Sequence, residues 1–61
     1  MEDRLLYLPE VAEQLRRSEA QMRWMHQNGK GPRFARIGGR LMAKASDVTA
    51  WIDAQFDKES A

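Results

Sequence analysis

Two adjacent glycines near the middle of the chain, Gly38 and Gly39, constrain the fold more than any other feature of the sequence. They separate two short runs, Arg33 to Ile37 and Arg40 to Ala43. Glycine tolerates the positive φ angles of a type I′ turn, which commonly joins the two strands of a β-hairpin. The sequence therefore predicts a hairpin with the two glycines at its tip.

The two-residue turn also fixes the register of this hairpin. The predicted pairs are Ile37 with Arg40, Arg36 with Leu41, Ala35 with Met42, and Phe34 with Ala43. Phe34, Leu41 and Ala43 then share a face, which we expect to lie on the core. Arg36 and Arg40 bracket a slim, positive tip that could approach a DNA minor groove or run along phosphates. The alternative is an exposed turn that only closes the hairpin.

A helix is predicted directly before the hairpin. Ser18 has the chemistry of an N-cap, and Gln21 lies at the right spacing to complete a capping box. Asn28-Gly29 ends the helix, because glycine accepts the left-handed conformation that a helix C-terminus often needs. At about 100° per residue, Met22, Met25 and His26 fall on one side, the expected core face.

The opposite side of this helix carries an amide, a guanidinium and an indole, the groups that read or hold nucleic acids. Its residues are Ala20, Arg23, Trp24 and Gln27. Trp24 has two interpretations: it packs under the connection from Pro32 to Phe34, or it lies at the DNA surface. His26 has no partner cluster, so we expect a structural role and no metal.

Shorter elements flank this unit. Pro9 to Leu15 has helical apolar spacing after a lead-in from Met1 to Leu6, and Leu5, Leu6 and Tyr7 could cover one edge of the core. Only Arg16-Arg17 separates this helix from the next, which is typical of a helix-turn-helix.

Asp47 to about Phe56 is predicted as a third amphipathic helix, capped by Ser46, that places Trp51 and Ile52 in the core. Asp57 to Ala61 should fray.

The charges are segregated along the chain, although the net charge is only +1. Residues 16 to 44 contain eight basic side chains and one acid, Glu19, whereas the flanks contain eight acids and two basic residues. This distribution predicts a positive surface on the central unit, as in a small polyanion-binding protein. The alternative is a mixed surface of ordinary solvated charges.

Several classes of function have little support. A chain of 61 residues forms one domain, with an ordered core at about residues 5 to 56, and is too small for an enzyme cavity of ordinary size. We find no nucleophile–base pair, carboxylate pair, metal cluster or cofactor motif, so we expect no enzyme, metal, cofactor or small-molecule ligand. The chain has no cysteine, no apolar run of about 18 residues and no signal-peptide pattern. We therefore expect a soluble, cytoplasmic protein.

Taken in order, these motifs resemble a known family. The resemblance rests on LPEVAEQL, Ser18-Glu19-Ala20-Gln21-Met22-Arg23-Trp24, Gly29-Lys30-Gly31-Pro32-Arg33-Phe34, Arg36-Ile37-Gly38-Gly39-Arg40, and Ser46-Asp47-Val48 with Ala50-Trp51-Ile52. The chain resembles the excisionase-type branch of the MerR-like winged helix-turn-helix family, small phage and plasmid proteins related to AlpA regulators. The implied fold is mainly α with a small β-hairpin: helix, turn, helix, hairpin wing, helix.

In such proteins the second helix enters the major groove, and the wing touches the neighbouring minor groove or backbone. The segment from Gln21 to Trp24 resembles a Thr-Leu-Arg-Tyr pattern whose Arg and aromatic residue hold phosphates, which implies the same for Arg23 and Trp24. Two residues depart from the family. Arg17 replaces an apolar turn residue, and Glu19 is an acid near the end of the helix that would read the bases. Glu19 could accept from a cytosine amino group or discourage wrong sequences.

The expected DNA contacts come from two regions. They are Ser18, Glu19, Ala20, Gln21, Arg23, Trp24 and Gln27 in the recognition helix, and Arg16, Arg17, Lys30, Arg33, Arg36, Gly38, Gly39 and Arg40 in the turn and wing. The resemblance implies an excisionase, a recombination directionality factor that binds and bends double-stranded DNA beside copies of itself and directs an integrase in a bacterial host, at the nucleoid. The alternatives are a small AlpA-like transcriptional regulator and a protein-interaction module that does not meet DNA.

Overall fold

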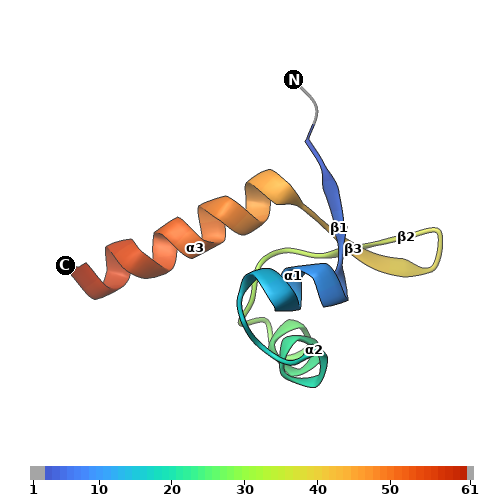
Figure 1. The fold of residues 1–61 in the computed structure, drawn as a ribbon, viewed down its shortest axis with the longest axis horizontal. Coiled ribbons are helices and arrows are strands. Elements are labelled where there is room, and N and C mark those ends of the chain that lie inside the picture. Colours follow the sequence, from blue (N-terminus) through green and yellow to red (C-terminus); the bar gives the residue numbers. More distant parts are fainter. Residues whose placement is uncertain (1–2, 61) are drawn as a thin grey trace.

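The computed structural model describes residues 3–60, with side chains for residues 3–59. Within this range the elements are β1 (Leu5–Tyr7), α1 (Leu8–Gln14), α2 (Glu19–Gln27), β2 (Ala35–Ile37), β3 (Arg40–Lys44) and α3 (Ala45–Ser60), shown in Figure 1. The described residues thus form three helices and a three-stranded antiparallel sheet, a mixed α/β arrangement. The expectation of a mainly α protein with a hairpin is correct for the helices and the hairpin, but it is incomplete for the sheet.

The hairpin of β2 and β3 has the predicted register. Ile37 lies opposite Arg40, and the next two pairs follow as expected. Gly38 and Gly39 have φ angles of +58° and +87°, as the type I′ turn requires. The fourth predicted pair lies beyond the ladder, because β2 begins at Ala35.

The strand β1 is absent from the sequence prediction, which treats this segment as a lead-in. It pairs antiparallel with β3, so that β3 lies between β1 and β2. Leu6, opposite Ala43, is buried in the core, whereas Leu5 and Tyr7 point to the exposed face. Three residues are too few to show a period of two, and the partner strand lies at the other end of the chain. Met1 and Glu2 lie outside the described residues.

The turn between α1 and α2 is a Schellman motif with arginine at the position that usually carries glycine. The N–H of Arg17 donates to the Ala12 carbonyl at 2.9 Å, and the N–H of Arg16 donates to the Glu13 carbonyl at 3.0 Å. Arg16 has a φ of +59°, the only positive φ of a non-glycine residue among those described. This geometry lets α2 start after a very short connection.

Both ends of α2 are close to the prediction. The Ser18 hydroxyl accepts the Gln21 N–H at 3.1 Å, so the N-cap is confirmed. This bond is one half of the predicted capping box. The other half, from the Ser18 N–H to the Gln21 side chain, is not among the hydrogen bonds of the described residues. At the other end Gly29 has a φ of +65°, and the Lys30 N–H donates to the Met25 carbonyl at 2.8 Å. These bonds satisfy backbone groups that the helix leaves unpaired.

The core is small and draws on every helix and on two strands. Its fully or nearly buried apolar residues are Leu6, Leu8, Val11, Ala12, Met22, Ala43 and Val48. Met25 packs against this cluster, and the His26 ring lies edge-on to Phe34 with centroids 5.3 Å apart. The predicted core faces of α2 and of the hairpin are therefore confirmed.

The third helix begins earlier and ends later than predicted. It follows β3 without a loop, and Ser46 lies inside it, so the prediction of Ser46 as N-cap is wrong. Asp3 caps the helix instead: its carboxylate accepts the Ser46 N–H at 3.0 Å and the Ser46 hydroxyl at 2.5 Å. The Arg4 carbonyl accepts the Ala45 N–H at 2.8 Å. The capping groups come from the opposite end of the chain, which local sequence rules do not consider.

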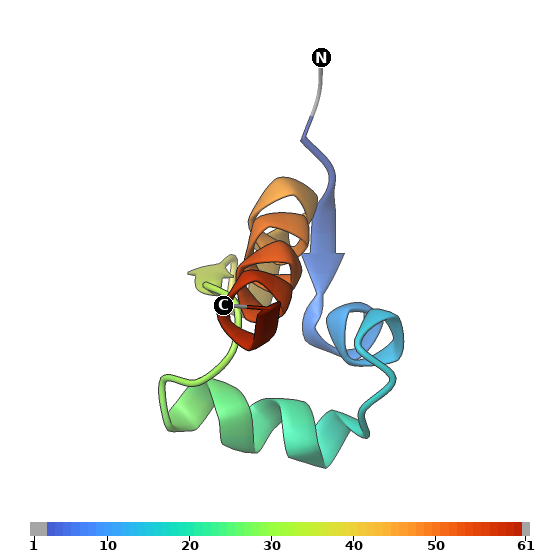
Figure 2. The same cartoon turned by 90° about the vertical axis from the view of Figure 1, so that its left-hand side faces the viewer.

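The second half of α3 extends beyond the rest of the molecule (Figure 1), and Figure 2 looks along this helix with α1 and α2 at its side. Trp51 and Ile52 are half-buried, so the sequence overestimates their place in the core, whereas Val48 is fully buried. Phe56 is 70% exposed. Residues 57–60 are helical, contrary to the predicted fraying, and Ala61 lies outside the described residues.

We predict that Arg16→Gly stabilises the protein. An L-residue in the left-handed region costs about 1–2 kcal/mol. Glycine removes this cost, but it also raises the conformational entropy of the unfolded chain, which offsets part of the stabilisation. Urea unfolding should show a net increase of about 0.5–1 kcal/mol in the free energy of unfolding. The matched control is Arg17→Gly, at a neighbour without positive φ, which should destabilise. A lower stability for Arg16→Gly would contradict the strained turn.

We also predict that Asp3→Asn lowers the thermal midpoint near neutral pH. Hydrogen bonds from the Ser46 hydroxyl and then from the Ser46 N–H lower the pKa of the Asp3 carboxyl below its ordinary value of 3.8. A lowered folded-state pKa stabilises the protein above the unfolded value, and this contribution disappears as the pH falls through the folded value. The difference in Tm between wild type and Asp3→Asn should therefore shrink below about pH 4. A difference independent of pH would refute the carboxylate cap.

Candidate nucleic-acid interface

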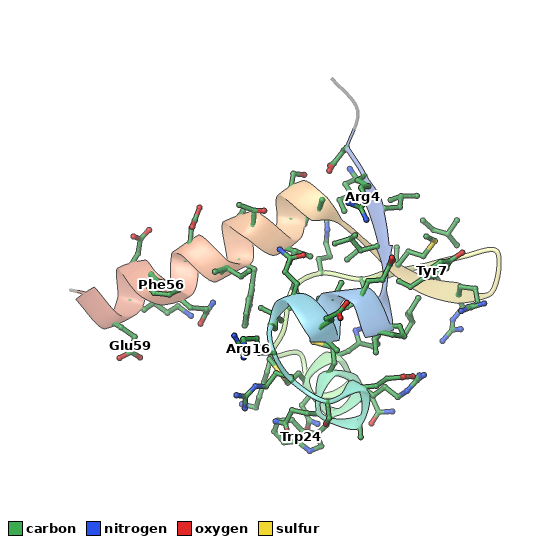
Figure 3. All side chains as sticks on the ribbon, viewed as in Figure 1. Arg4, Tyr7, Arg16, Trp24, Phe56 and Glu59 are labelled. Carbon is green, nitrogen blue, oxygen red and sulfur yellow. The ribbon has the colours of Figure 1, made fainter. Side chains whose placement is uncertain are left out.

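The outward face of α2 is the one the sequence predicts. Met22 is fully buried and fixes the rotation of the helix, so Ala20, Arg23, Trp24 and Gln27 all point to solvent. Trp24 is 50% exposed, and in Figure 3 it lies on the side of α2 away from the sheet. Of its two predicted positions, the structure has the exposed one. This face therefore presents an indole, an amide and a guanidinium together.

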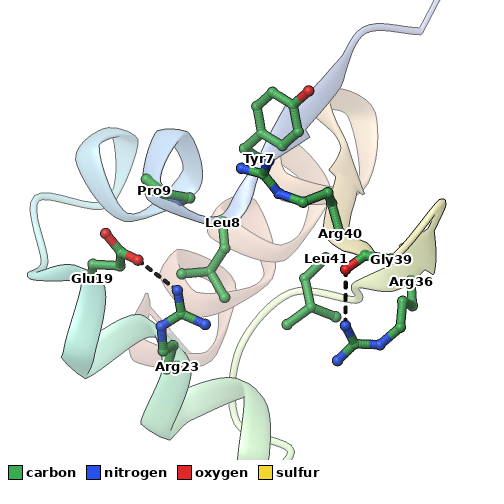
Figure 4. Close-up of a pocket in the computed structure, with 9 residues that line it drawn as sticks. All are labelled: Tyr7, Leu8, Pro9, Glu19, Arg23, Arg36, Gly39, Arg40 and Leu41. Atoms are coloured by element: carbon green, nitrogen blue, oxygen red, sulfur yellow. Dashed lines mark hydrogen bonds and ion pairs between the residues drawn. The ribbon is translucent and has the colours of Figure 1, made fainter.

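A hollow of about 180 Å³ lies between α2 and the hairpin (Figure 4). It gathers side chains from five elements, including one arginine from each of α2, β2 and β3. The lining residues are Tyr7, Leu8, Pro9, Glu19, Arg23, Arg36, Gly39, Arg40 and Leu41. Three of the predicted contact arginines thus meet on a shared side of the molecule.

Two of these arginines are held by uncharged partners. Arg36 donates from Nη1 to the Gly39 carbonyl at 3.1 Å, and the Arg40 guanidinium lies 4.8 Å from the centroid of the Tyr7 ring. The carbonyl and the ring orient the guanidiniums but do not neutralise them. The hairpin therefore presents two oriented positive charges beside its tip.

Arg23 differs from the other two because it has an acidic partner. Its Nη2 lies 2.6 Å from Oε2 of Glu19, one helical turn earlier. Both side chains are about half exposed, at 56% and 49%. Exposed pairs at this spacing contribute only about 0.3–0.5 kcal/mol to stability. The ion pair thus compensates a charge in the hollow without contributing much to the fold.

The remaining predicted contacts lie outside the hollow. Arg33 pairs with Asp47 at 3.0 Å, beside an apolar depression on the other side of the hairpin. Arg17 and Gln21 line a third depression, together with Trp51 of α3. The other predicted residues are exposed at the turn, the ends of α2 and the hairpin tip: Arg16, Ser18, Lys30 and Gly38. The predicted set therefore divides into the α2–hairpin hollow and a more scattered periphery.

Sequence reasoning missed Tyr7 as a residue of this site. Its ring supports Arg40 because β1 pairs with β3, which places Tyr7 opposite Met42 and diagonal to Arg40. The only local signal is an aromatic residue in an apolar run, which equally fits a core residue. Recognising its position requires the strand pairing.

Besides apolar residues, the lining of the hollow consists of three arginines, one glutamate, one tyrosine and one glycine. In residues 3–59, no group of three or more His, Cys, Asp or Glu side chains is placed to hold a metal ion. Among the described helices, none is both long enough and apolar enough to cross a membrane. The side chains of the hollow can therefore bind a partner through their charges and hydrogen bonds.

Comparisons with protein-family models, with curated proteins and with solved structures find no match to this chain. The assignment of a function therefore depends on the geometry and charge of the hollow.

Proposed function

We propose that the protein is a small sequence-specific DNA-binding protein with a winged helix-turn-helix fold. In this proposal α2 is the recognition helix in the major groove, and the β2–β3 hairpin is the wing on the adjacent backbone or minor groove. The observation that carries the proposal is the convergence of Arg23, Arg36 and Arg40 on one hollow between these two elements. A duplex presents phosphates along both sides of a groove, which suits charges on two neighbouring elements.

The exposed face of α2 supports the reading role. Gln27 carries an amide that can donate to and accept from adenine in the major groove, and Trp24 offers an indole N–H and an apolar surface. Both side chains are accessible next to Arg23. The wing supports the positioning role, because its two guanidiniums are oriented and have no acidic partner among residues 3–59.

Within this class we propose an excisionase that binds beside copies of itself and directs an integrase toward excision. The support is the resemblance of the motifs together with size, since one small reader buries a modest interface and gains specificity from neighbours or a partner. A transcriptional regulator on the same fold is the second candidate, because both would read DNA in the same way. An excision assay with the integrase of the same genetic element separates them: the regulator would bind DNA without changing the direction of recombination.

A protein-interaction module is favoured by a different observation. The outer face of the sheet exposes Leu5, Tyr7 and Ile37 at 45%, 42% and 47%. Exposed apolar side chains gathered on one face often mark a protein contact. This function would leave binding to DNA weak and insensitive to salt.

For the wing, we expect Arg40→Ala to weaken binding to a mixed-sequence duplex. Loss of one phosphate contact should reduce the slope of log K against log salt by about 0.9, which is about eightfold in affinity near 0.1 M salt. Fluorescence anisotropy across a salt series measures both. Lys58→Ala is the control, because it removes the same charge from the far end of α3 and should change neither. Equal effects of the two substitutions would argue against a wing contact.

For α2, we expect Gln27→Ala to change base preference rather than overall affinity. A bidentate contact to adenine discriminates by about 1–3 kcal/mol, and its loss relaxes selection at one position. Selection of preferred sites from a random duplex library, for wild type and variant, measures the change. An unchanged preferred site would remove Gln27 from the reading face.

A further inference from the structure

Glu19 is the one acid within residues 16 to 44, and the structure places it in the hollow with the three arginines. We infer that Glu19 competes with DNA phosphates for Arg23 and thereby weakens binding to non-specific sequences. Glu19 then lowers the affinity of this surface for DNA phosphates by acting through Arg23. The inference rests on the proposed function, since it concerns the same surface.

The partners of the three arginines carry the first step. Arg36 and Arg40 are held by a carbonyl oxygen and an aromatic ring, which a phosphate can join without displacing a charge. Arg23 is held by a carboxylate at 2.6 Å. A carboxylate and a phosphate both present anionic oxygens to a guanidinium, so they compete for the same donors. Of the three guanidiniums in the hollow, Arg23 therefore has to exchange one anion for another to bind DNA.

The exposure of the pair makes this exchange feasible. With about half of each side chain in solvent, the ion pair is screened and weak, and it can open when DNA arrives. Opening leaves the Glu19 carboxylate close to the incoming phosphate, and this like-charge repulsion offsets the gain from Arg23. A random sequence supplies nothing further, whereas a correct site adds base contacts from the same face of α2. The ion pair therefore lowers the affinity that phosphate contacts alone can supply, and a correct site makes up this loss through its base contacts.

The test is Glu19→Gln, which keeps the length of the side chain and removes its charge. On a mixed-sequence duplex, freeing Arg23 adds about one phosphate contact, so the salt slope should steepen by about 0.9 and affinity should rise about eightfold near 0.1 M salt. Asp53→Asn is the matched control, because it makes the same change in net charge on an exposed position of α3 outside the hollow. It should leave slope and affinity unchanged.

A double-mutant cycle tests whether Glu19 acts through Arg23. In an Arg23→Gln background, Glu19→Gln should raise affinity less than in wild type and leave the salt slope unchanged, because no guanidinium is freed and only the repulsion between carboxylate and phosphate is removed. If Glu19→Gln tightens binding equally in both backgrounds, Glu19 repels phosphates directly and the inference is overturned. If Glu19→Gln has no effect on mixed-sequence DNA, the inference also fails, and an acceptor role toward cytosine remains the better account.

Two further measurements separate this inference from the proposed function. Wild type that binds the duplex without salt dependence would overturn the proposed function itself, and the competition with it. In the protein without DNA, the Arg23 Nε–Hε NMR signal should shift in Glu19→Gln and not in Asp53→Asn. An unchanged signal would overturn the inference alone, because it removes the ion pair while leaving the DNA-binding surface in place.

Discussion

The central strand β3 is the element on which the rest of the structure depends. It is paired on one edge with β1 and on the other with β2, and its last residue leads directly into α3. Because Leu6 and Ala43 are opposite one another and both buried, the same ladder that closes the sheet also supplies the core. In a chain of 61 residues with a small core, this pairing fixes the helices relative to the hairpin.

The position of the candidate site follows from this arrangement. The hairpin projects from the β3 ladder, and α2 is rotated by the burial of Met22 so that Arg23 faces the hairpin. The N-terminal strand contributes Tyr7, which supports Arg40. Elements that are distant in sequence thus bring three guanidiniums to one hollow, where Glu19 is the one acidic lining residue and pairs with one of the three.

Two charged residues occupy positions that the stability of the fold alone would not favour. Arg16 occupies a left-handed position that glycine fills at lower cost, and Glu19 pairs with Arg23 on a half-exposed surface where the pair stabilises little. Both residues lie close to the start of α2, the recognition helix of the proposed function. Departures from local preference at such positions are expected where a surface has a task besides folding.

Local signals in the sequence were sufficient for the elements whose geometry is decided within a few residues. The hairpin register follows from Gly38-Gly39, the start of α2 from Ser18, its end from Gly29, and its buried side from Met22. The basic segment from residue 16 to residue 44 contains the three arginines that line the hollow. These predictions succeeded because turn angles, caps and helical periodicity depend on neighbours in the chain.

Only the tertiary structure decided what depends on distant partners. Strand β1 exists because it pairs with β3, α3 begins at Ala45 because Asp3 and Arg4 supply its caps, and Arg33 is directed to Asp47 rather than to the hollow. The sequence supplied the arginines of the site, but not the contact of Arg40 with Tyr7, which lies on another strand. The physical reason is the same throughout: a hydrogen bond or ion pair between side chains is selected by which groups the folded backbone brings within reach, and composition and spacing contain no such distance.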